Sequence, residues 1–261
     1  MSIKESLGKG FKVTGQSMNL VLILFVFGAV WNVLNVFLAP KTQNPQLSAS
    51  AGLIILAVVF GLVSIYLQAG SLGFILNNLK TGGRDLSSFM QSGGKFYARL
   101  LVLGLIVAAV AGVLVLVAAL LMAATAGNVV AIVVTVAIAA TGIYFAILIF
   151  LAPYIIVADD QKVMVSVRQS IALVKKNLLK VLGLAVLLIL IGFGVGLLLG
   201  VLFAALSAVM KGTAPQIVFA VLSSFVNSYL GVLVSASFMA FYLALSGSTG
   251  AGSRSLSDMV K

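Results

Sequence analysis

The sequence predicts an all-α integral membrane protein with six transmembrane helices and two or three amphipathic interfacial helices on the cytoplasmic side. Three observations lead to this fold class. The 261 residues are 62% hydrophobic and 8% charged, whereas soluble domains are about a quarter charged. The charged residues are confined to short segments, and each stretch between them has the roughly 20 apolar residues that a spanning helix needs. Finally, Lys and Arg gather in alternate segments, as is typical of cytoplasmic loops.

The spans follow from these charge-free stretches and from the turn residues that divide them. The uncharged stretch from Leu100 to Ala158 is too long for one helix at 1.5 Å per residue. Ala126, Gly127 and Asn128 favour a turn within it, and Pro215 suits the first turn of the last span. The predicted spans cover about residues 18–38, 52–76, 100–124, 129–152, 181–209 and 215–245.

The distribution of positive charge predicts the orientation. Fourteen of the sixteen basic residues fall in the N-terminus, the 2–3 loop, the 4–5 loop and the C-terminus, and only Lys41 and Lys211 fall in the other loops. Because Lys and Arg are enriched on the inner side, we expect both termini in the cytoplasm and the protein in a prokaryotic plasma membrane.

Three basic segments, residues 2–16, 84–97 and 162–178, have an apolar stripe opposite their charges. The first places Ile3, Leu7, Phe11 and Thr14 on one face, with Glu5 and Lys9 four residues apart on the other. In the third, Asp159 or Asp160 is placed to cap the helix. Such helices lie in the inner headgroup layer, either as ordinary anchors or as a dedicated surface for anionic lipid or a protein partner. The candidate contact residues are Lys4, Lys9, Lys12, Arg84, Lys95, Arg99, Arg168, Lys175, Lys176 and Lys180.

The spacing of these segments suggests three repeats within a single membrane domain, residues 1–246. Each segment precedes two spans, which gives units 1–83, 84–160 and 161–246. The openings Ser2-Ile3-Lys4-Glu5-Ser6-Leu7 and Ser166-Val167-Arg168-Gln169-Ser170-Ile171 match class for class. Chance similarity between amphipathic helices is the alternative. Residues 247–261 are rich in Ser and Gly and are predicted to form a flexible tail.

The composition argues against most site chemistry. The chain has no Cys and no His, which removes disulfides, the usual metal ligands and the commonest general base. None of the five acidic residues falls within a predicted span, so a buried proton relay is not expected. We expect no enzyme activity and no cofactor. The net charge of +11 is located where inner-leaflet lipid would meet it, so nucleic acid is not an expected partner.

Two sets of residues within the spans suggest close helix contacts. Glycine or alanine recurs every fourth residue in the third and fifth spans, which lets helix backbones approach, within the chain or between subunits. These residues are Gly104, Ala108, Gly112, Gly192, Gly196 and Gly200. Polar residues also recur at helical spacing, either for interhelical hydrogen bonds or to line a solute path. They are Asn32, Asn35, Ser224, Asn227 and Ser228.

One passage resembles a known group of proteins. Leu151-Ala152-Pro153-Tyr154 leads through Asp159-Asp160 into Val165-Ser166-Val167-Arg168-Gln169-Ser170 and on to Asn177. This resembles prokaryotic six-span proteins related to the membrane domain attached to some glycerophosphodiester phosphodiesterases. The resemblance implies a similar six-span fold over nearly the whole chain. It implies no catalytic residue, because the membrane part is not the catalytic part and this chain has no histidine.

These observations favour a non-enzymatic accessory, scaffold or complex subunit. It would bind membrane lipid and protein partners, or a second copy of itself, through its basic cytoplasmic face. The alternative is a permease or the membrane subunit of an ATP-driven transporter, which would need a separate ATPase in contact with Arg84–Tyr97.

Overall fold

The computed structural model describes residues 2–38, 51–125, 128–210 and 212–257, although not the side chains of 51–54 and 248–257. The described residues form helices and no strand. Six of the helices are long and apolar enough to cross a membrane, which confirms the predicted fold class. The elements are α1 (Ile3–Gln16), α2 (Met18–Leu38), α3 (Ala51–Thr81), α4 (Leu86–Ala124), α5 (Val129–Ile149), α6 (Ala152–Ala158), α7 (Val163–Lys176), α8 (Leu178–Val209) and α9 (Ala214–Ser257).

Three helix boundaries differ from the predicted ones. The second amphipathic segment, residues 84–97, is not a separate helix but leads into α4, which runs without a break into its span. The fourth span ends earlier than predicted as a continuous helix, because the chain turns at Phe150 and Leu151 before Pro153 opens α6. The last span was predicted to end near Leu245, but α9 continues as helix to Ser257. Flexibility of the tail stays a prediction.

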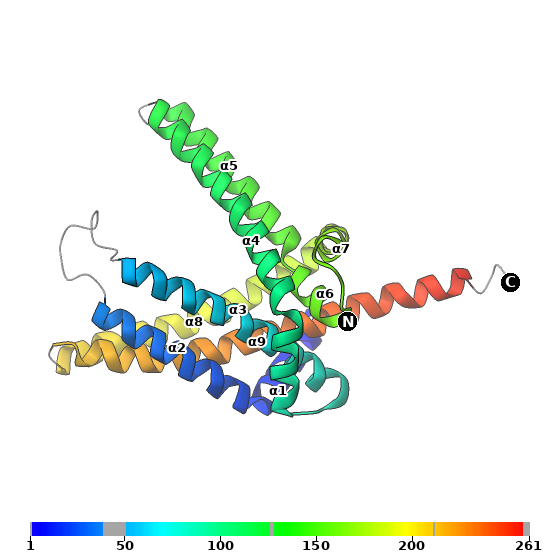
Figure 1. Cartoon of the computed structure of the whole chain (residues 1–261), viewed down its shortest axis with the longest axis horizontal. Helices are drawn as coiled ribbons and strands as arrows, with labels where there is room; N and C mark the ends of the chain where they lie inside the picture. The colour runs from blue at the N-terminus through cyan, green and yellow to red at the C-terminus, as the bar shows by residue number, and fades with distance from the viewer. Residues whose placement is uncertain (1, 39–50, 126–127, 211, 258–261) are drawn as a thin grey trace.

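Each amphipathic segment packs against the end of a span. The start of α4 packs on α3, and α7 packs on α5 and α6. Similarly, α1 packs on α9, the last span of the chain, so the first and last helices of the sequence lie side by side. The C-terminal part of α9 extends away from the bundle (Figure 1). The second and third segments therefore contact the span that precedes them in the sequence. The first segment has no preceding span and contacts the last span, α9. This arrangement agrees with the three-unit pattern, while a common origin of the units stays a prediction.

The α4–α5 hairpin diverges from the other spans. In Figure 1 its outer part points away from α2, α3, α8 and α9, which lie roughly along one another. Among the described residues, α2 packs extensively on α9 and α4 on α3, whereas α5 and α8 make no comparable contact. The bundle is therefore open on the side between these two helices.

The buried core lies toward the end that carries α1, α6 and α7. Its largest fully buried side chains come mainly from the last turns of α3, from α6 and from the second half of α9, among them Phe74, Ile155, Phe241 and Tyr242. By contrast, at most 22% of the most apolar window in any spanning helix is buried. Lipid covers such exposed apolar surface in a membrane, so the spans meet mostly lipid, while the end that carries α1, α6 and α7 packs like a soluble core.

Glycine packing occurs at other positions than predicted. A Cβ added at Gly104, Gly112, Gly192, Gly196 or Gly200 would meet nothing within 4 Å, and Ala108 is exposed. These ridges therefore make no close contact within the described chain, because α8 and the outer part of α4 face outward. The glycines that do allow close approach include Gly10, against Ser237 of α9, and Gly183 of α8, against Ile3 of α1. Between α3 and α4 they are Gly70, Gly73 and Gly93.

Candidate functional site

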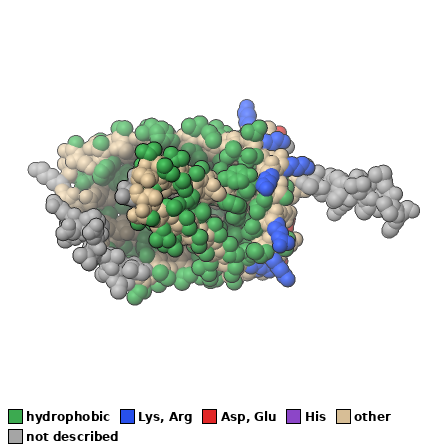
Figure 2. Space-filling view, turned by 90° about the horizontal axis from the view of Figure 1, so that it is seen from above, with side chains coloured by type: hydrophobic (Ala, Val, Ile, Leu, Met, Phe, Trp, Pro, Cys, Tyr) green, Lys and Arg blue, Asp and Glu red, His purple; other side chains and the backbone are tan. Residues whose placement is uncertain are grey.

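The described Lys and Arg side chains gather at one end of the molecule. Figure 2 shows them on the end that carries α1 and α7, beyond a body covered by hydrophobic side chains. We call this end the basic end. It comprises the ten candidate contact residues predicted above together with Lys80 and Lys162. The sequence-predicted cations from three separate segments are thus brought to a single surface.

The helix α1 turns small polar residues toward the bundle together with Val13, Ile3 and Leu7. Ser6, Gly10 and Thr14 are buried, whereas Phe11 is 42% exposed. The predicted apolar face is thus divided, because Thr14 is buried and Ile3 and Leu7 pack against the core, while Phe11 does not. Small residues are needed on this face because α1 lies so close to α9 that a Cβ at Gly10 would collide with the Ser237 hydroxyl. This leaves the Lys4, Lys9 and Lys12 side of α1 exposed.

The helix α7 is held in the same way. Ser166 and Ser170 are fully buried, and the Ser170 hydroxyl donates to the carbonyl oxygen of Leu148 in α5 at 2.7 Å. This hydrogen bond gives a partner both to the buried serine hydroxyl and to a carbonyl oxygen in the last turn of α5, where the helix itself supplies no donor. The opposite side of α7 presents Arg168, Lys175 and Lys176 to the surroundings.

Two acidic residues cap helices and do not neutralise the basic end. Glu5 accepts from the Ser2 backbone N–H at 2.8 Å, while the Ser2 hydroxyl accepts from Glu5 N–H. This capping box replaces the predicted pair of Glu5 with Lys9, because the carboxylate is turned to the helix N-terminus. Asp85 caps α4 by accepting from the Ser87 N–H and hydroxyl, and these hydrogen bonds hold the pKa of its carboxyl below the usual range.

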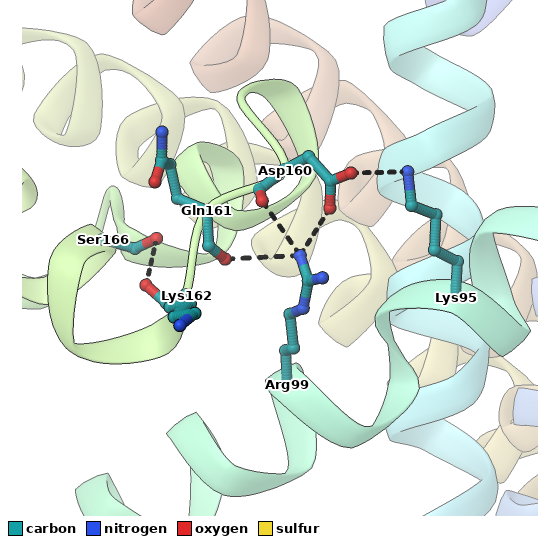
Figure 3. A network of polar contacts seen from close by, with 6 residues as sticks. All are labelled: Lys95, Arg99, Asp160, Gln161, Lys162 and Ser166. Atoms are coloured by element: carbon teal, nitrogen blue, oxygen red, sulfur yellow. Dashed lines mark hydrogen bonds and ion pairs between the residues drawn. The ribbon is translucent and has the colours of Figure 1, made fainter.

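The ion-pair cluster of the basic end is centred on Asp160 (Figure 3). Its carboxylate lies 2.8 Å from Lys95 Nζ and 2.5 Å from Arg99 Nη1. Arg99 also donates to the backbone carbonyl oxygens of Asp160 and Gln161. Lys95 and Arg99 lie one turn apart on α4, so they present both cations to the same carboxylate. The cluster fastens α4 to the loop between α6 and α7.

The preceding residue, Asp159, joins the same loop to α9. Its carboxylate accepts from the Tyr242 hydroxyl at 2.6 Å. The prediction that Asp159 or Asp160 caps the third amphipathic helix was wrong, because both side chains are held by other helices. The N-cap of α7 is Lys162, which makes no side-chain capping hydrogen bond.

The charges around Asp160 change its acidity. Hydrogen bonds from Lys95 and Arg99 hold the pKa of the Asp160 carboxyl below its usual range. The carboxylate is therefore ionised at neutral pH and remains paired. Two of the predicted lipid contacts, Lys95 and Arg99, accordingly have an internal partner, whereas among the described side chains no ion pair joins the eight others to a carboxylate.

Residues 1–245 match the family described as "Domain of unknown function (DUF7847)". The chain belongs to this family. No curated protein and no solved structure matches it. The resemblance to the membrane domain of glycerophosphodiester phosphodiesterases therefore stays a prediction.

In this DUF7847 chain the predicted polar path is divided. Asn32 of α2 donates to the Ser224 hydroxyl of α9 at 2.8 Å, and Ser228 donates to the Ser224 carbonyl oxygen. Asn35 and Asn227 are exposed, and Asn35 donates instead to the carbonyl oxygen of Trp31. The interhelical hydrogen bond agrees with the packing interpretation of these residues, and the five do not form one polar face.

The DUF7847 fold also contains a cavity that the sequence did not predict. It has a volume of about 650 Å³ and lies between the α4–α5 hairpin and residues of α3, α6 and α9. Its walls are mostly aliphatic, with Gln68, Thr135 and Ser235 among the polar exceptions. No sequence pattern could have found it, because it results from the angle at which the hairpin diverges. In the described part of the chain, no group of three or more acidic residues is placed to hold a metal ion.

Proposed function

We propose that this protein is a non-enzymatic accessory or scaffold subunit of a prokaryotic plasma membrane, with both termini in the cytoplasm. Its basic end binds anionic lipid headgroups and acidic surfaces of protein partners, or of a second copy. The observation that carries this proposal is a difference between the acidic and the basic side chains of that end. Each described carboxylate has a hydrogen-bond donor within the chain, whereas the cations of α1 and α7 are exposed and unpaired among the described residues.

The expected strength of this binding follows from the number of free cations. A Lys or Arg at the surface of an anionic leaflet contributes about 1 kcal/mol, and this attraction falls off within a Debye length of about 10 Å at 0.1 M salt. The cations of α1 and α7 act together because the fold holds both helices at one end. The basic end therefore concentrates anionic lipid around the protein at low salt and loses much of this effect at high salt.

The test compares the protein in nanodiscs of phosphatidylcholine with and without phosphatidylglycerol. We expect phosphatidylglycerol to raise the melting temperature at low salt. Lys9→Gln, Lys12→Gln, Lys175→Gln and Lys176→Gln combined should remove most of that rise. The matched control is Lys41→Gln with Lys211→Gln, which removes cations from the loops predicted on the other side and should leave the rise unchanged. An equal rise in the quadruple variant and the wild type would contradict the proposal.

A second candidate function, the permease, is favoured by the cavity within the membrane-spanning region. Its coupling segment would be Arg84–Tyr97, which in this structure leads into α4 and packs on α3 through the buried Phe89. A conformational change in a separate ATPase that contacts this segment would be transmitted directly along α4. Stimulation of a co-purified ATPase by the protein, lost on charge reversal at Arg84, would favour the permease over the scaffold.

A further inference from the structure

We propose that the cavity beside the α4–α5 hairpin holds a hydrocarbon chain of one anionic phospholipid of the inner leaflet, whose headgroup is bound by the cations around Asp160. The inference rests on the proposed function, because it also requires anionic lipid at the basic end. It adds a second lipid site, which is distinct from the outward faces of α1 and α7.

The length of the cavity suits a lipid chain. On α4 its wall is formed by residues that recur every three or four positions from Leu103 to Ala118, including Val107 and Leu114. Residues at this spacing share one face of a helix. At 1.5 Å per residue this face is about 22 Å long, whereas the hydrocarbon of one leaflet is about 15 Å thick, half of the roughly 30 Å core. A chain that enters from the inner leaflet therefore fits along the wall.

The width of the cavity comes from small residues. On the side of the hairpin its wall contains Ala111 and Ala118 of α4 and Ala139, Gly142 and Ala146 of α5. In lipid, helices gain little from burying apolar surface against each other, since lipid chains are equally apolar. An aliphatic space between diverging spans is therefore filled by hydrocarbon, and a volume of about 650 Å³ lies within the range of pockets that hold small apolar ligands.

The charge at one end of this cavity selects the headgroup. Arg99 lies one turn before Leu103, on the same face of α4. The opposite wall includes Tyr154 of α6, and the Asp159–Asp160 loop follows the end of that helix. Both walls thus lead to the network of Figure 3. Around it the three cations Lys95, Arg99 and Lys162 outnumber the two carboxylates of Asp160 and the adjacent Asp159. The excess positive charge is complementary to a phosphate group.

A cavity-filling pair of substitutions tests the site. The wild type is taken from nanodiscs with equal phosphatidylcholine and phosphatidylglycerol into mild detergent, and native mass spectrometry records the lipid that stays bound. We expect one retained phosphatidylglycerol per chain. Ala111→Phe with Ala139→Phe should abolish it. The control is Ala109→Phe with Ala137→Phe, on the same two helices but outside the cavity lining, and should retain it. Retention by both double variants, or a wild type without bound lipid, would overturn the proposal.

A second measurement does not depend on filling the cavity. Because the chain has no cysteine, a bimane label can be placed at Ala139→Cys or, as control, at Ala137→Cys. After extraction from nanodiscs that contain phosphatidylglycerol with brominated chains, retained lipid should quench the label at 139 and leave that at 137 unquenched. Equal fluorescence at the two positions would overturn the proposal.

The outcomes separate this inference from the proposed function. Lys162→Gln should weaken the preference of the retained lipid for phosphatidylglycerol without changing the stabilisation that depends on α1 and α7. If no lipid is retained but the melting temperature still rises with phosphatidylglycerol, the cavity site is wrong and the proposed function stands. Dimers in the spectra that are lost in the cavity-filling variant would instead show that a second copy of the chain occupies the cavity, which also overturns the lipid site.

Discussion

Arg99 of α4 donates to both the carboxylate and the backbone carbonyl of Asp160, sixty-one positions further along the chain. Asp160 has a φ of 54°, in the left-handed region that Asp and Asn adopt more readily than most other residues with a Cβ. This backbone turn aims the side chain back at α4. The contact thus depends on a local conformation and a long-range ion pair together.

Replacing Asp160 with Asn should lower the melting temperature at neutral pH. Asn tolerates the same backbone conformation, so the substitution removes the charge and leaves the turn unstrained. The pKa of the folded carboxyl is depressed, so its stabilisation is complete above the unfolded carboxyl pKa, about 4, and is lost as the pH falls below that value. The difference between wild type and variant should be large at pH 7 and shrink below pH 4.

The control for this prediction is Glu5→Gln, which also removes one negative charge. Gln can replace Glu in a capping box, and Glu5 is not part of an ion pair in the structure. Its melting temperature should differ little from that of the wild type over the same pH range. A pH-independent loss of stability in Asp160→Asn would mean that the ion pairs with Lys95 and Arg99 contribute nothing.

Replacing Tyr242 with Phe should destabilise the protein by about 1.5 to 3 kcal/mol, as is usual for a lost hydrogen bond to a charged group. The ring stays in place, and only the donor to Asp159 is removed. Chemical unfolding in lipid–detergent micelles measures the change in the free energy of unfolding. Tyr144→Phe, at a ring that is 45% exposed, should have little effect, and equal losses in both variants would contradict the contact.

Replacing glycine with alanine should have opposite effects on stability at Gly10 and at Gly196. Gly10→Ala should be destabilising, because its Cβ would collide with Ser237. Gly196→Ala meets open space and should be neutral or stabilising by up to about 1 kcal/mol from helix propensity. The melting temperatures of the variants measure both effects. Adding Ser237→Gly to Gly10→Ala should restore part of the lost stability. A loss at Gly196 as large as that at Gly10 would indicate a contact with another subunit.

The hydrogen bond between Asn32 and Ser224 should be worth about 0.6 kcal/mol, the usual coupling within membranes. A double-mutant cycle with Asn32→Ala and Ser224→Ala measures it. The same cycle with Asn35→Ala and Ser224→Ala is the control, because Asn35 instead donates to the carbonyl oxygen of Trp31. Coupling in the control cycle as strong as in the first would rule out a specific contact.

The sequence predicted the six spans and the surface that gathers the cations, because both follow from strong, local patterns of hydropathy and charge. The span α2 begins and ends where the charge-free stretch predicts. Tertiary contacts could not be predicted in this way. Asp159 and Asp160 have the spacing of helix caps, yet Tyr242 and Arg99 hold them from positions far away in the chain.

Glycine spacing illustrates the same limit. The regular ridge at Gly192, Gly196 and Gly200 is a stronger pattern than the isolated Gly10, yet only Gly10 lies against another helix. A ridge indicates that a helix can be approached closely, but whether a partner lies there depends on the position of the helix in the bundle. Here α8 is at the open side, so its ridge faces outward.

The orientation of the basic end is tested most directly by cysteine accessibility, since the chain has no native cysteine. Lys175→Cys and Lys211→Cys are treated with a membrane-impermeant maleimide in intact spheroplasts and again after permeabilisation. If the basic end faces the cytoplasm, Lys211→Cys is labelled in intact spheroplasts and Lys175→Cys only after permeabilisation. Labelling of Lys175→Cys from outside would contradict the orientation and, with it, the proposed binding of inner-leaflet lipid.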